Sequence, residues 1–271
     1  MNRNQYIRLA KKAADLQIKE LKKIKKIFNK NFIQAVDLIL NCKGKVIFAG
    51  IGKSGLIARK ISATFSSVGI PSFFCDPAQA LHGDMGQIEK KDILIIFSYS
   101  GNTSELTNML KYANRFRIKI IGVASKSDSL LLKASDIKLL LPIVKESDLT
   151  GMVPTTSTSI TLLLGDCLAT TVMSKKRFSK EKFKIFHPGG NIGGKLLLAK
   201  DIMVTGDKLP IINYNKSLGS ALQVINKKKL GIVVVLKNKF IEGLVTDGDL
   251  RREIKFLSKK TSLKKLMTKN P

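Results

Sequence analysis

The sequence predicts an α/β protein in which a parallel sheet with flanking helices is followed by a small α+β domain. From residue 43 on, short apolar runs that end in Gly or Ser alternate with stretches of helical spacing, which is typical of a parallel sheet covered on both faces. The alternation stops at 188–194 (PGGNIGG), and a second pattern begins near Leu198. A length of 271 residues is enough for one large domain and one smaller one.

The first 42 residues are predicted to be helical. Within 9–40, six apolar residues fall on one stripe and lysines fill the opposite face, as in an amphipathic helix formed in one long piece or two short ones. The stripe consists of Leu21, Ile24, Phe28, Phe32, Val36 and Ile39. We expect segment 1–42 to pack on the sheet domain or on a partner subunit rather than on a membrane surface.

Residues 43–195 are predicted to form the sheet domain. Its strands are expected at 45–49, 72–74, 93–97, 118–123 and 137–141. Its helices are expected at 54–68, 103–115 and 157–174. Ligands of open parallel sheets bind beyond the carboxyl ends of the strands, so the loops that follow the strands are the expected place for a site.

The second domain is predicted to span 198–265. A helix at 217–228, strands at 231–236 and 240–245 and a helix opened by Asp247 give it an α+β pattern. Residues 266–268 (LMT) echo 202–204 (IMV), so 266–271 is predicted to be the start of a second, truncated copy that stops at Pro271.

The formal charge of +28 makes nucleic acid the first partner to consider. However, 40 of the 48 basic residues are Lys, whereas base-edge and bidentate phosphate contacts favour Arg. Residues 43–150, which carry the candidate motifs, hold 15 basic and 9 acidic residues, and the basic terminal runs lack interleaved aromatics for base stacking. We therefore predict a solvated lysine-rich surface and no nucleic-acid partner.

Location and redox state follow from what the sequence lacks. No apolar run approaches the roughly 18–20 residues of a membrane helix, and the N-terminus has no apolar stretch typical of a signal peptide. We expect a cytoplasmic protein with no membrane partner. Cys42, Cys75 and Cys167 are widely spaced in apolar surroundings, which favours buried thiols over disulfides or a zinc ribbon.

The first candidate motif is the glycine-rich stretch 50–55 (GIGKSG), which lies between a predicted strand and a predicted helix. Glycines there let backbone N–H groups approach an anion at the helix N-terminus, and Lys53 adds a positive charge. The spacing is not that of a nucleoside-triphosphate loop. The alternative is that these glycines only close a tight turn.

The second candidate motif is 98–103 (SYSGNT), again between a strand and a helix. The hydroxyls of Ser98, Ser100 and Thr103 can donate hydrogen bonds to a phosphate while helix-terminal amides supply the rest. The alternative is a simple helix cap, for which one Ser would suffice. The run 155–159 (TTSTS) before the next helix either closes the same phosphate site or only caps its own helix.

Both histidines and two acidic residues are candidates for chemistry. His82 and His187 lie in Gly-flanked loops, where side chains project from the rigid sheet. Glu105 follows the Ser/Thr loop and Glu146 lies in a later loop, and both are notable in a chain poor in acidic residues. Spacing alone leaves open that Glu105 only favours the helix dipole and that Glu146 is only a loop charge.

Taken in order, five motifs resemble the D-arabinose 5-phosphate isomerase family: GKSG, HGDMG, SYSGNTSE, PTTSTS and HPGG, followed by DGDLRR. That family joins a sugar isomerase (SIS) domain to a pair of CBS domains, interconverts D-ribulose 5-phosphate with D-arabinose 5-phosphate, and supplies the synthesis of Kdo for lipopolysaccharide. The resemblance covers nearly the whole chain. It implies a homotetramer and no cofactor.

The resemblance also implies roles for single residues. Lys53, Glu105, Glu146 and His187 match catalytic positions, with His187 expected to reach the site of a neighbouring subunit. The implied substrate-binding positions are Gly52, Ser54, Gly69, Ile70, Asp76, His82, Ser98, Ser100, Thr103, Thr155 and Ser157.

Two features depart from the family. Where relatives carry a His ahead of the HGDMG motif, this chain has Asp76, and a carboxylate with His82 is a poor transition-metal pair, so no required metal is predicted. The second CBS unit stops at about its first turn, so regulation through the cleft of a CBS pair is not expected, while the sequence leaves open whether this region binds a nucleotide or only packs. CBS-like residues 201–265 are then expected to serve in packing or dimerisation.

An aldose–ketose isomerase moves a proton between C1 and C2 through an enediol, which needs a carboxylate base and a donor that polarises the carbonyl. We predict Glu146 as the proton shuttle. The alternatives are an isomerase of another sugar phosphate, or a SIS-type regulator that binds sugar phosphate without turnover. Such regulators carry a helix-turn-helix domain before the sugar domain, and only about 42 residues precede the first strand here.

Overall fold

The computed structural model describes residues 3–187, 198–252, 261–269 and 271, which fall into two compact units, Met1–Leu196 and Leu197–Pro271. The first unit contains a five-stranded, all-parallel sheet in the order β2-β1-β3-β4-β5. Its strands are β1 (Val46–Gly50), β2 (Ser72–Cys75), β3 (Ile93–Phe97), β4 (Lys119–Ala124) and β5 (Ile137–Leu140). The five predicted strands are therefore confirmed, with ends that differ by at most one residue.

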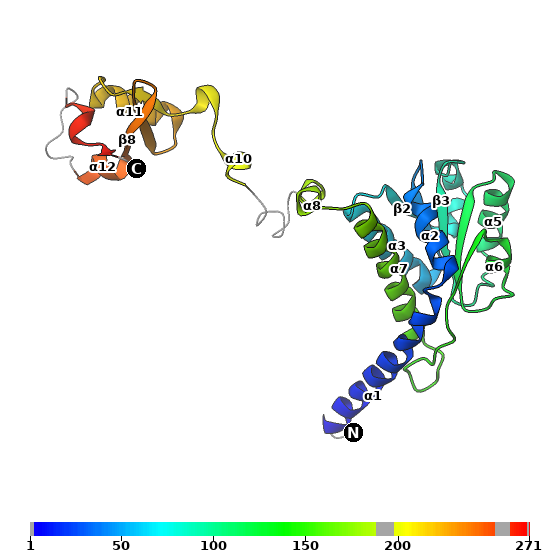
Figure 1. Cartoon of the computed structure of the whole chain (residues 1–271). Helices are drawn as coiled ribbons and strands as arrows, with labels where there is room; N and C mark the ends of the chain where they lie inside the picture. Colours follow the sequence, from blue (N-terminus) through cyan, green and yellow to red (C-terminus); the bar gives the residue numbers. More distant parts are fainter. Residues whose placement is uncertain (1–2, 188–197, 253–260, 270) are drawn as a thin grey trace. The chain divides into compact units, whose positions relative to one another are not determined.

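Helices cover both faces of this sheet (Figure 1). One face is covered by α2 (Lys30–Leu40), α3 (Gly52–Ser67) and α7 (Thr156–Lys175), and the other by α4 (Pro77–Ala80), α5 (Leu106–Arg115) and α6 (Leu130–Ala134). Because both faces are covered, every side chain of β1 and β3 is buried, which explains their unbroken apolar sequences.

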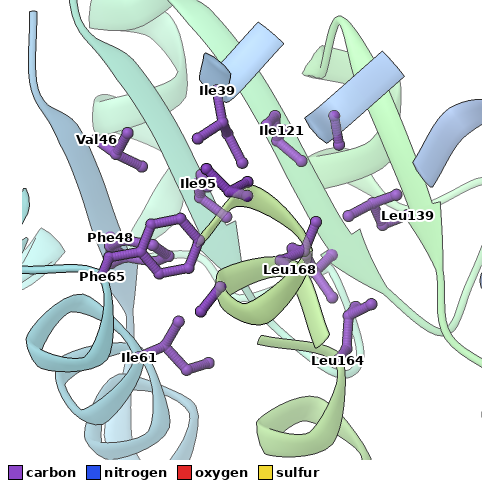
Figure 2. Close-up of a cluster of buried hydrophobic side chains, with 14 of the residues drawn as sticks. Ile39, Val46, Phe48, Ile61, Phe65, Ile95, Ile121, Leu139, Leu164 and Leu168 are labelled. Carbon is purple, nitrogen blue, oxygen red and sulfur yellow. The ribbon is translucent and has the colours of Figure 1, made fainter. Parts of the chain in front are cut away.

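The larger core lies between the sheet and the α2–α3–α7 layer. In Figure 2, Phe48 of β1 meets Phe65 of α3 edge-on, with ring centroids 4.9 Å apart, and Leu164 and Leu168 of α7 complete the layer. Helices α3 and α7 approach closely at Gly165, where a Cβ atom would lie 2.2 Å from Cδ1 of Ile61. The core thus fixes α7, whose N-terminus borders the candidate site.

The N-terminal segment folds as α1 (Arg3–Leu21), a 3-10 helix η1 (Lys22–Ile27) and α2. The predicted apolar stripe is mostly buried, but Phe28 is 42% exposed because the helix breaks there. Asn29 restarts it, since its Oδ1 accepts a hydrogen bond from the Asn31 amide at 2.9 Å. Helix α1 contacts α7 and projects beyond the sheet (Figure 1).

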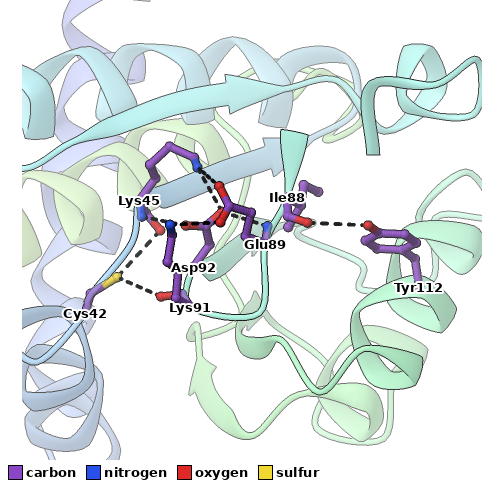
Figure 3. A network of polar contacts seen from close by, with 7 residues as sticks. All are labelled: Cys42, Lys45, Ile88, Glu89, Lys91, Asp92 and Tyr112. Atoms are coloured by element: carbon purple, nitrogen blue, oxygen red, sulfur yellow. Dashed lines mark hydrogen bonds and ion pairs between the residues drawn. The ribbon is translucent and has the colours of Figure 1, made fainter. Parts of the chain in front are cut away.

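A polar network holds the amino ends of β1 and β3 together (Figure 3). The side chain of Asp92, 1% exposed, accepts hydrogen bonds from the amides of Lys45 (2.7 Å) and Glu89 (2.8 Å). Burial would lower the pKa of Lys45, but its contacts with Asp92 and Glu89 outweigh that and raise it. Cys42 donates its thiol to the carbonyl of Lys45. The buried carboxylate of Asp92 thus has hydrogen-bond and charged partners, as a buried charge requires.

The chain ends its first unit with α8 (Lys180–Phe186). Of the cysteines predicted to be buried, Cys75 is buried, but Cys42 and Cys167 are only half-buried. Within the described residues no helix is long and apolar enough to cross a membrane.

The second unit is a mixed four-stranded sheet in the order β6-β7-β8-β9. It contains α10 (Ala199–Ile202), η3 (Gly206–Lys208), β6 (Ile211–Asn213), α11 (Leu218–Lys228), β7 (Ile232–Lys237), β8 (Phe240–Thr246), α12 (Asp247–Arg252), η5 (Leu263–Lys265) and β9 (Thr268–Lys269). The strands and helices predicted for 198–265 are present, and β6 was not predicted.

Residues 266–269 belong to the fold of the second unit. Leu266 and Met267 pack with its core, and Thr268 pairs with Leu244 of β8 in antiparallel register. Thr268 and Lys269 thus form the edge strand β9 of this sheet, and the start of a second copy at 266–271 stays a prediction.

Candidate active site

A cavity of about 500 Å³ lies beyond the carboxyl ends of β1 and β3. The chain leaves β1 toward β2 on one side and returns to β3 on the other, so these two strands flank the switch point where ligands of open α/β sheets bind. Gly50 and Phe97 pair at the ends of the two strands, which brings both candidate motifs to one edge. The lining residues are Ile51, Lys53, Ser54, Ile57, Tyr99, Ser100, Val144, Glu146, Gly151, Met152, Pro154, Ser157, Thr158 and Thr161.

The β1–α3 loop supplies Lys53 and Ser54 to the cavity wall. Helix α3 begins at Gly52, whose φ of +57° suits glycine, and its N-cap residue, Ile51, has no side chain that caps the N-terminal amides. A Cβ atom on Gly55 would lie 2.6 Å from the Gly50 carbonyl oxygen, so the turn requires a glycine at this position. The motif therefore both closes a turn and leaves helix-terminal N–H groups next to Lys53, where an anion is favoured.

The β3–α5 loop contributes Ser100 to the cavity wall. Ser98 is buried, and its Oγ lies 2.8 Å from the Thr103 hydroxyl and accepts a hydrogen bond from the Gly101 amide at 3.1 Å. Of the three hydroxyls, those of Ser98 and Thr103 contact each other and hold the loop in shape, whereas Ser100 lines the cavity.

Glu146 caps α7 and lines the same cavity as Lys53. Its Oε2 accepts hydrogen bonds from the amides of Thr155 (2.8 Å), Thr156 (2.7 Å) and Ser157 (3.3 Å), and from the Thr155 hydroxyl (2.9 Å). Burial alone would raise the pKa of Glu146, but hydrogen bonds from Ser157 and Thr155 outweigh it and lower that pKa. The carboxylate is therefore ionised at neutral pH.

Two loop positions are set by Tyr99, which the sequence reasoning did not single out. Its hydroxyl accepts a hydrogen bond from the Val144 amide at 2.9 Å and donates one to the Pro142 carbonyl at 3.3 Å. Burial raises the pKa of Tyr99. Thr161 was also missed, although it lies one turn after Thr158 of the run 155–159 on α7.

Several predicted site residues lie elsewhere in the single chain. Glu105 is exposed at the start of α5, where its own amide and the Ser104 hydroxyl lower its pKa. Asp76 caps α4 through the Ala78 amide at 2.9 Å, and His82 is exposed in the turn that follows. In the described ranges, no group of three His, Cys, Asp or Glu side chains could hold a metal ion.

Gly69 and Ile70 lie farthest from the cavity among the predicted substrate-binding residues of the β1–β2 connection. They precede β2 at the amino edge of the sheet, opposite the cavity, and Ile70 is 3% exposed within the core. Gly69 has φ +79° and lies under Phe186, so its glycine serves the turn from α3 to β2. The single chain thus does not bring these two residues to the cavity, and their contact with substrate stays a prediction.

His187 also lies apart from the cavity. Its ring stacks on Phe183 at a centroid distance of 3.8 Å, and its Nδ1 lies 2.9 Å from the Phe183 carbonyl oxygen. It lines a shallow hollow with residues of α3 and the edge strand β2, among them Arg59 and Phe74. The stretch HPGG continues into 188–190, outside the described residues.

The fold and the cavity define a SIS-type sugar-phosphate domain followed by a CBS domain, and sequence profiles of the two, SIS domain and CBS domain, match residues 39–171 and 199–256. The chain belongs to the arabinose 5-phosphate isomerase family. It is 42% identical to arabinose 5-phosphate isomerase KdsD of Escherichia coli K12 over 234 residues, which cover 86% of this chain and 71% of that protein.

Two further comparisons agree with this membership. KdsD of Salmonella typhimurium is 39% identical over 244 residues, covering 89% of this chain and 74% of the relative. A solved structure from Escherichia coli CFT073, in complex with arabinose 5-phosphate, superposes with a TM-score of 0.67 at 34% identity, covering 69% of this chain and all of that one.

Proposed function

We propose that this protein interconverts D-ribulose 5-phosphate and D-arabinose 5-phosphate through an enediol. The observation that carries the proposal is that a carboxylate, Glu146, and an ammonium group, Lys53, line the same cavity. This cavity lies at the switch point of the sheet. The names of its close relatives support the same reaction. The product would supply Kdo synthesis.

In the proposed reaction Glu146 carries the proton between C1 and C2. A base must be unprotonated to accept a proton, and the lowered pKa of Glu146 keeps it so throughout the neutral range. Lys53 would donate to the carbonyl oxygen and stabilise the negative charge that develops on the enediolate. These two groups supply what the chemistry needs without a metal, so we expect activity to survive treatment with a chelator.

The phosphate group is proposed to bind between Ser100 and the uncapped amides at the start of α3. Hydroxyl and amide donors favour an anion there, and the net positive charge of the chain adds a long-range attraction that salt would weaken. Three of the other predicted contacts, Ser54, Thr155 and Ser157, lie in or beside the same wall, which supports this placement of the substrate.

We also propose that the active form is a cytoplasmic homotetramer in which His187 serves the cavity of a neighbouring subunit. The support is its place in a hollow beside β2, away from its own cavity, together with exposed apolar residues on α1, including Tyr6, Ile7 and Ile18. Mixing His187→Ala with Glu146→Gln subunits should then restore part of the activity. Where the two kinds of subunit are neighbours, one site combines the intact Glu146 of the first with the intact His187 of the second.

The proposal is tested by incubating the purified protein with ribulose 5-phosphate and following arabinose 5-phosphate by NMR. Glu146→Gln is the matched variant, since it keeps the shape of the side chain and removes the base. Absence of conversion by the wild-type protein, together with tight binding to DNA, would instead support the regulator alternative. Loss of activity in a chelator and its return with one divalent ion would contradict the metal-free chemistry.

A further inference from the structure

Helix α1 contacts the segment that carries Glu146, on both sides of that residue. Glu20, 3% exposed, accepts a hydrogen bond from the Lys145 amide through Oε2 at 3.0 Å. Gln17, one turn earlier on the same face, donates its Nε2 hydrogen to the Ser147 hydroxyl at 3.1 Å. The residues immediately before and after Glu146 are thus held by one helix that is remote from them in sequence.

The contact from Gln17 continues to the carboxylate itself. The Ser147 hydroxyl donates to the Thr155 hydroxyl at 3.0 Å, and the Thr155 hydroxyl donates to Oε2 of Glu146 at 2.9 Å. The Ser147 amide also donates to the Thr155 hydroxyl at 3.0 Å. Three donors therefore run in one direction, from Gln17 through Ser147 and Thr155 to Glu146, and each bond polarises the next.

The side chain of Gln17 is held from its other end as well. Its Oε1 accepts a hydrogen bond from the Ser159 hydroxyl of α7 at 3.0 Å, so the amide cannot turn away from Ser147 without losing a partner. Glu20 is held by Lys23, whose ammonium lies 2.5 Å from the same Oε2 and also donates to the Ile143 carbonyl at 3.3 Å. A carboxylate this buried is costly unless bonded in this way.

We propose that α1 is a positioning element of the active site, in which Gln17 and Glu20 hold residues 145–147 so that the Glu146 carboxylate faces the cavity and keeps its donors. The inference rests on the proposed role of Glu146 as the base. Neither residue lines the cavity, so both act through Glu146 and neither is expected to touch substrate.

The test uses Gln17→Ala and Glu20→Ala in the full-length protein. Lys19→Ala is the matched control, because Lys19 is exposed on the same helix. We expect kcat to fall by about ten- to a hundredfold in the two variants, the size of effect that a small misplacement of a catalytic group produces, with KM changed less than about threefold. Glu20→Gln keeps an acceptor for the Lys145 amide and should recover part of the loss.

A second measurement separates this proposal from the isomerase proposal. The titration of Glu146 can be followed without substrate by carboxyl 13C NMR, in a site where Lys53 and Tyr99 are the other titratable groups that line the cavity. Loss of Gln17 loosens the donors that favour the ionised form, so the pKa of Glu146 should rise, and the acid limb of kcat should move to higher pH.

Each outcome has a definite meaning. A raised pKa of Glu146 in Gln17→Ala without any turnover by the wild-type protein would keep the positioning role and reject the isomerase. Turnover, KM and Glu146 titration that match Lys19→Ala would overturn the positioning role even in an active enzyme. A variant whose Tm lies below that of Lys19→Ala is replaced by Gln17→Glu, which keeps the acceptor for Ser159 and replaces the donor to Ser147 by a carboxylate oxygen. Because the added negative charge itself raises the pKa of Glu146, kcat and KM are the readouts for this variant, and values equal to those of Lys19→Ala would overturn the positioning role.

Discussion

Replacing Glu146 by Gln tests the catalytic and the structural role of one carboxylate at the same time. The amide oxygen can occupy the place of Oε2, but the charge that faces the N-terminus of α7 is lost. A hydrogen bond to a charged acceptor contributes about 1.5–3 kcal/mol and a neutral one about 0.5–1.5 kcal/mol. The interaction with the helix dipole adds about 0.3–1 kcal/mol.

Because Glu146 is only half-buried, screening by solvent places the expected loss of stability near the low end, at about 1 kcal/mol, which lowers Tm by about 2–4 °C. Folding lowers the pKa of Glu146, so the stability from its charge is present above the unfolded-state pKa of about 4.3 and is lost as pH falls through the folded pKa. Wild type and variant should therefore differ in Tm at pH 7, and the difference should shrink as pH falls below about 4.3 and vanish once pH is below the folded pKa.

The same variant should lose about 10²–10⁴-fold in kcat, the usual contribution of a general base. Calorimetry from pH 3.5 to 7 and the NMR turnover assay measure the two effects separately. Near-normal kcat with substrate still bound would remove Glu146 from the role of base. A constant difference in Tm across the pH range would show that the charge contributes nothing to the cap.

Three further predictions address other parts of the first unit. Gly165→Ala should destabilise the protein by about 1–3 kcal/mol, because its Cβ atom would collide with Ile61. Gly86→Ala is the control, since the space around Gly86 is open, and its free energy of unfolding in denaturant should be nearly unchanged. Lys53→Gln should lower kcat/KM by about 10²-fold or more with Tm unchanged, as expected for loss of one charge-stabilising donor, and unchanged kinetics would remove it from the mechanism. Burial raises the pKa of Cys75 to about 11, so its alkylation at pH 8 should be slower than that of a half-buried thiol, and equal rates by mass spectrometry would contradict its burial.

The fold was predictable because the strands of the first unit are buried on both faces. The run 93–97 is apolar at every position, as expected of a strand covered on both faces, and β3 has the same bounds. The second sheet was harder, since β6 and β9 are three and two residues long and depend on pairing partners distant in sequence. Whether so few residues form an edge strand depends on the strand they pair with more than on their own side chains.

The cavity was predicted in part, for a related reason. Lys53 and Ser100 lie just beyond the ends of β1 and β3, so the parallel topology brings them together. Glu146 lies within the loop between β5 and α7, where its place depends on the path of that loop. His187 lies beside the edge strand β2, and Gly69 lies at the amino edge of the sheet. A sequence motif does not indicate at which edge of a sheet its loop will lie. The support of Glu146 by Gln17 could not be read from sequence, because it joins residues about 130 positions apart.

The buried Asp92 network at the amino ends of β1 and β3 has a consequence for where this unit can open. Amides held by Asp92, those of Lys45 and Glu89, should exchange their hydrogens only when the whole sheet unfolds. At the opposite end of the strands, the β3–α5 loop is tied by the hydroxyl contact between Ser98 and Thr103, which can break without loss of a backbone pair of the sheet. The sheet of the first unit is thus held firmly at the amino ends of its strands, and the β3–α5 loop can adjust at the cavity without a change in the register of the sheet.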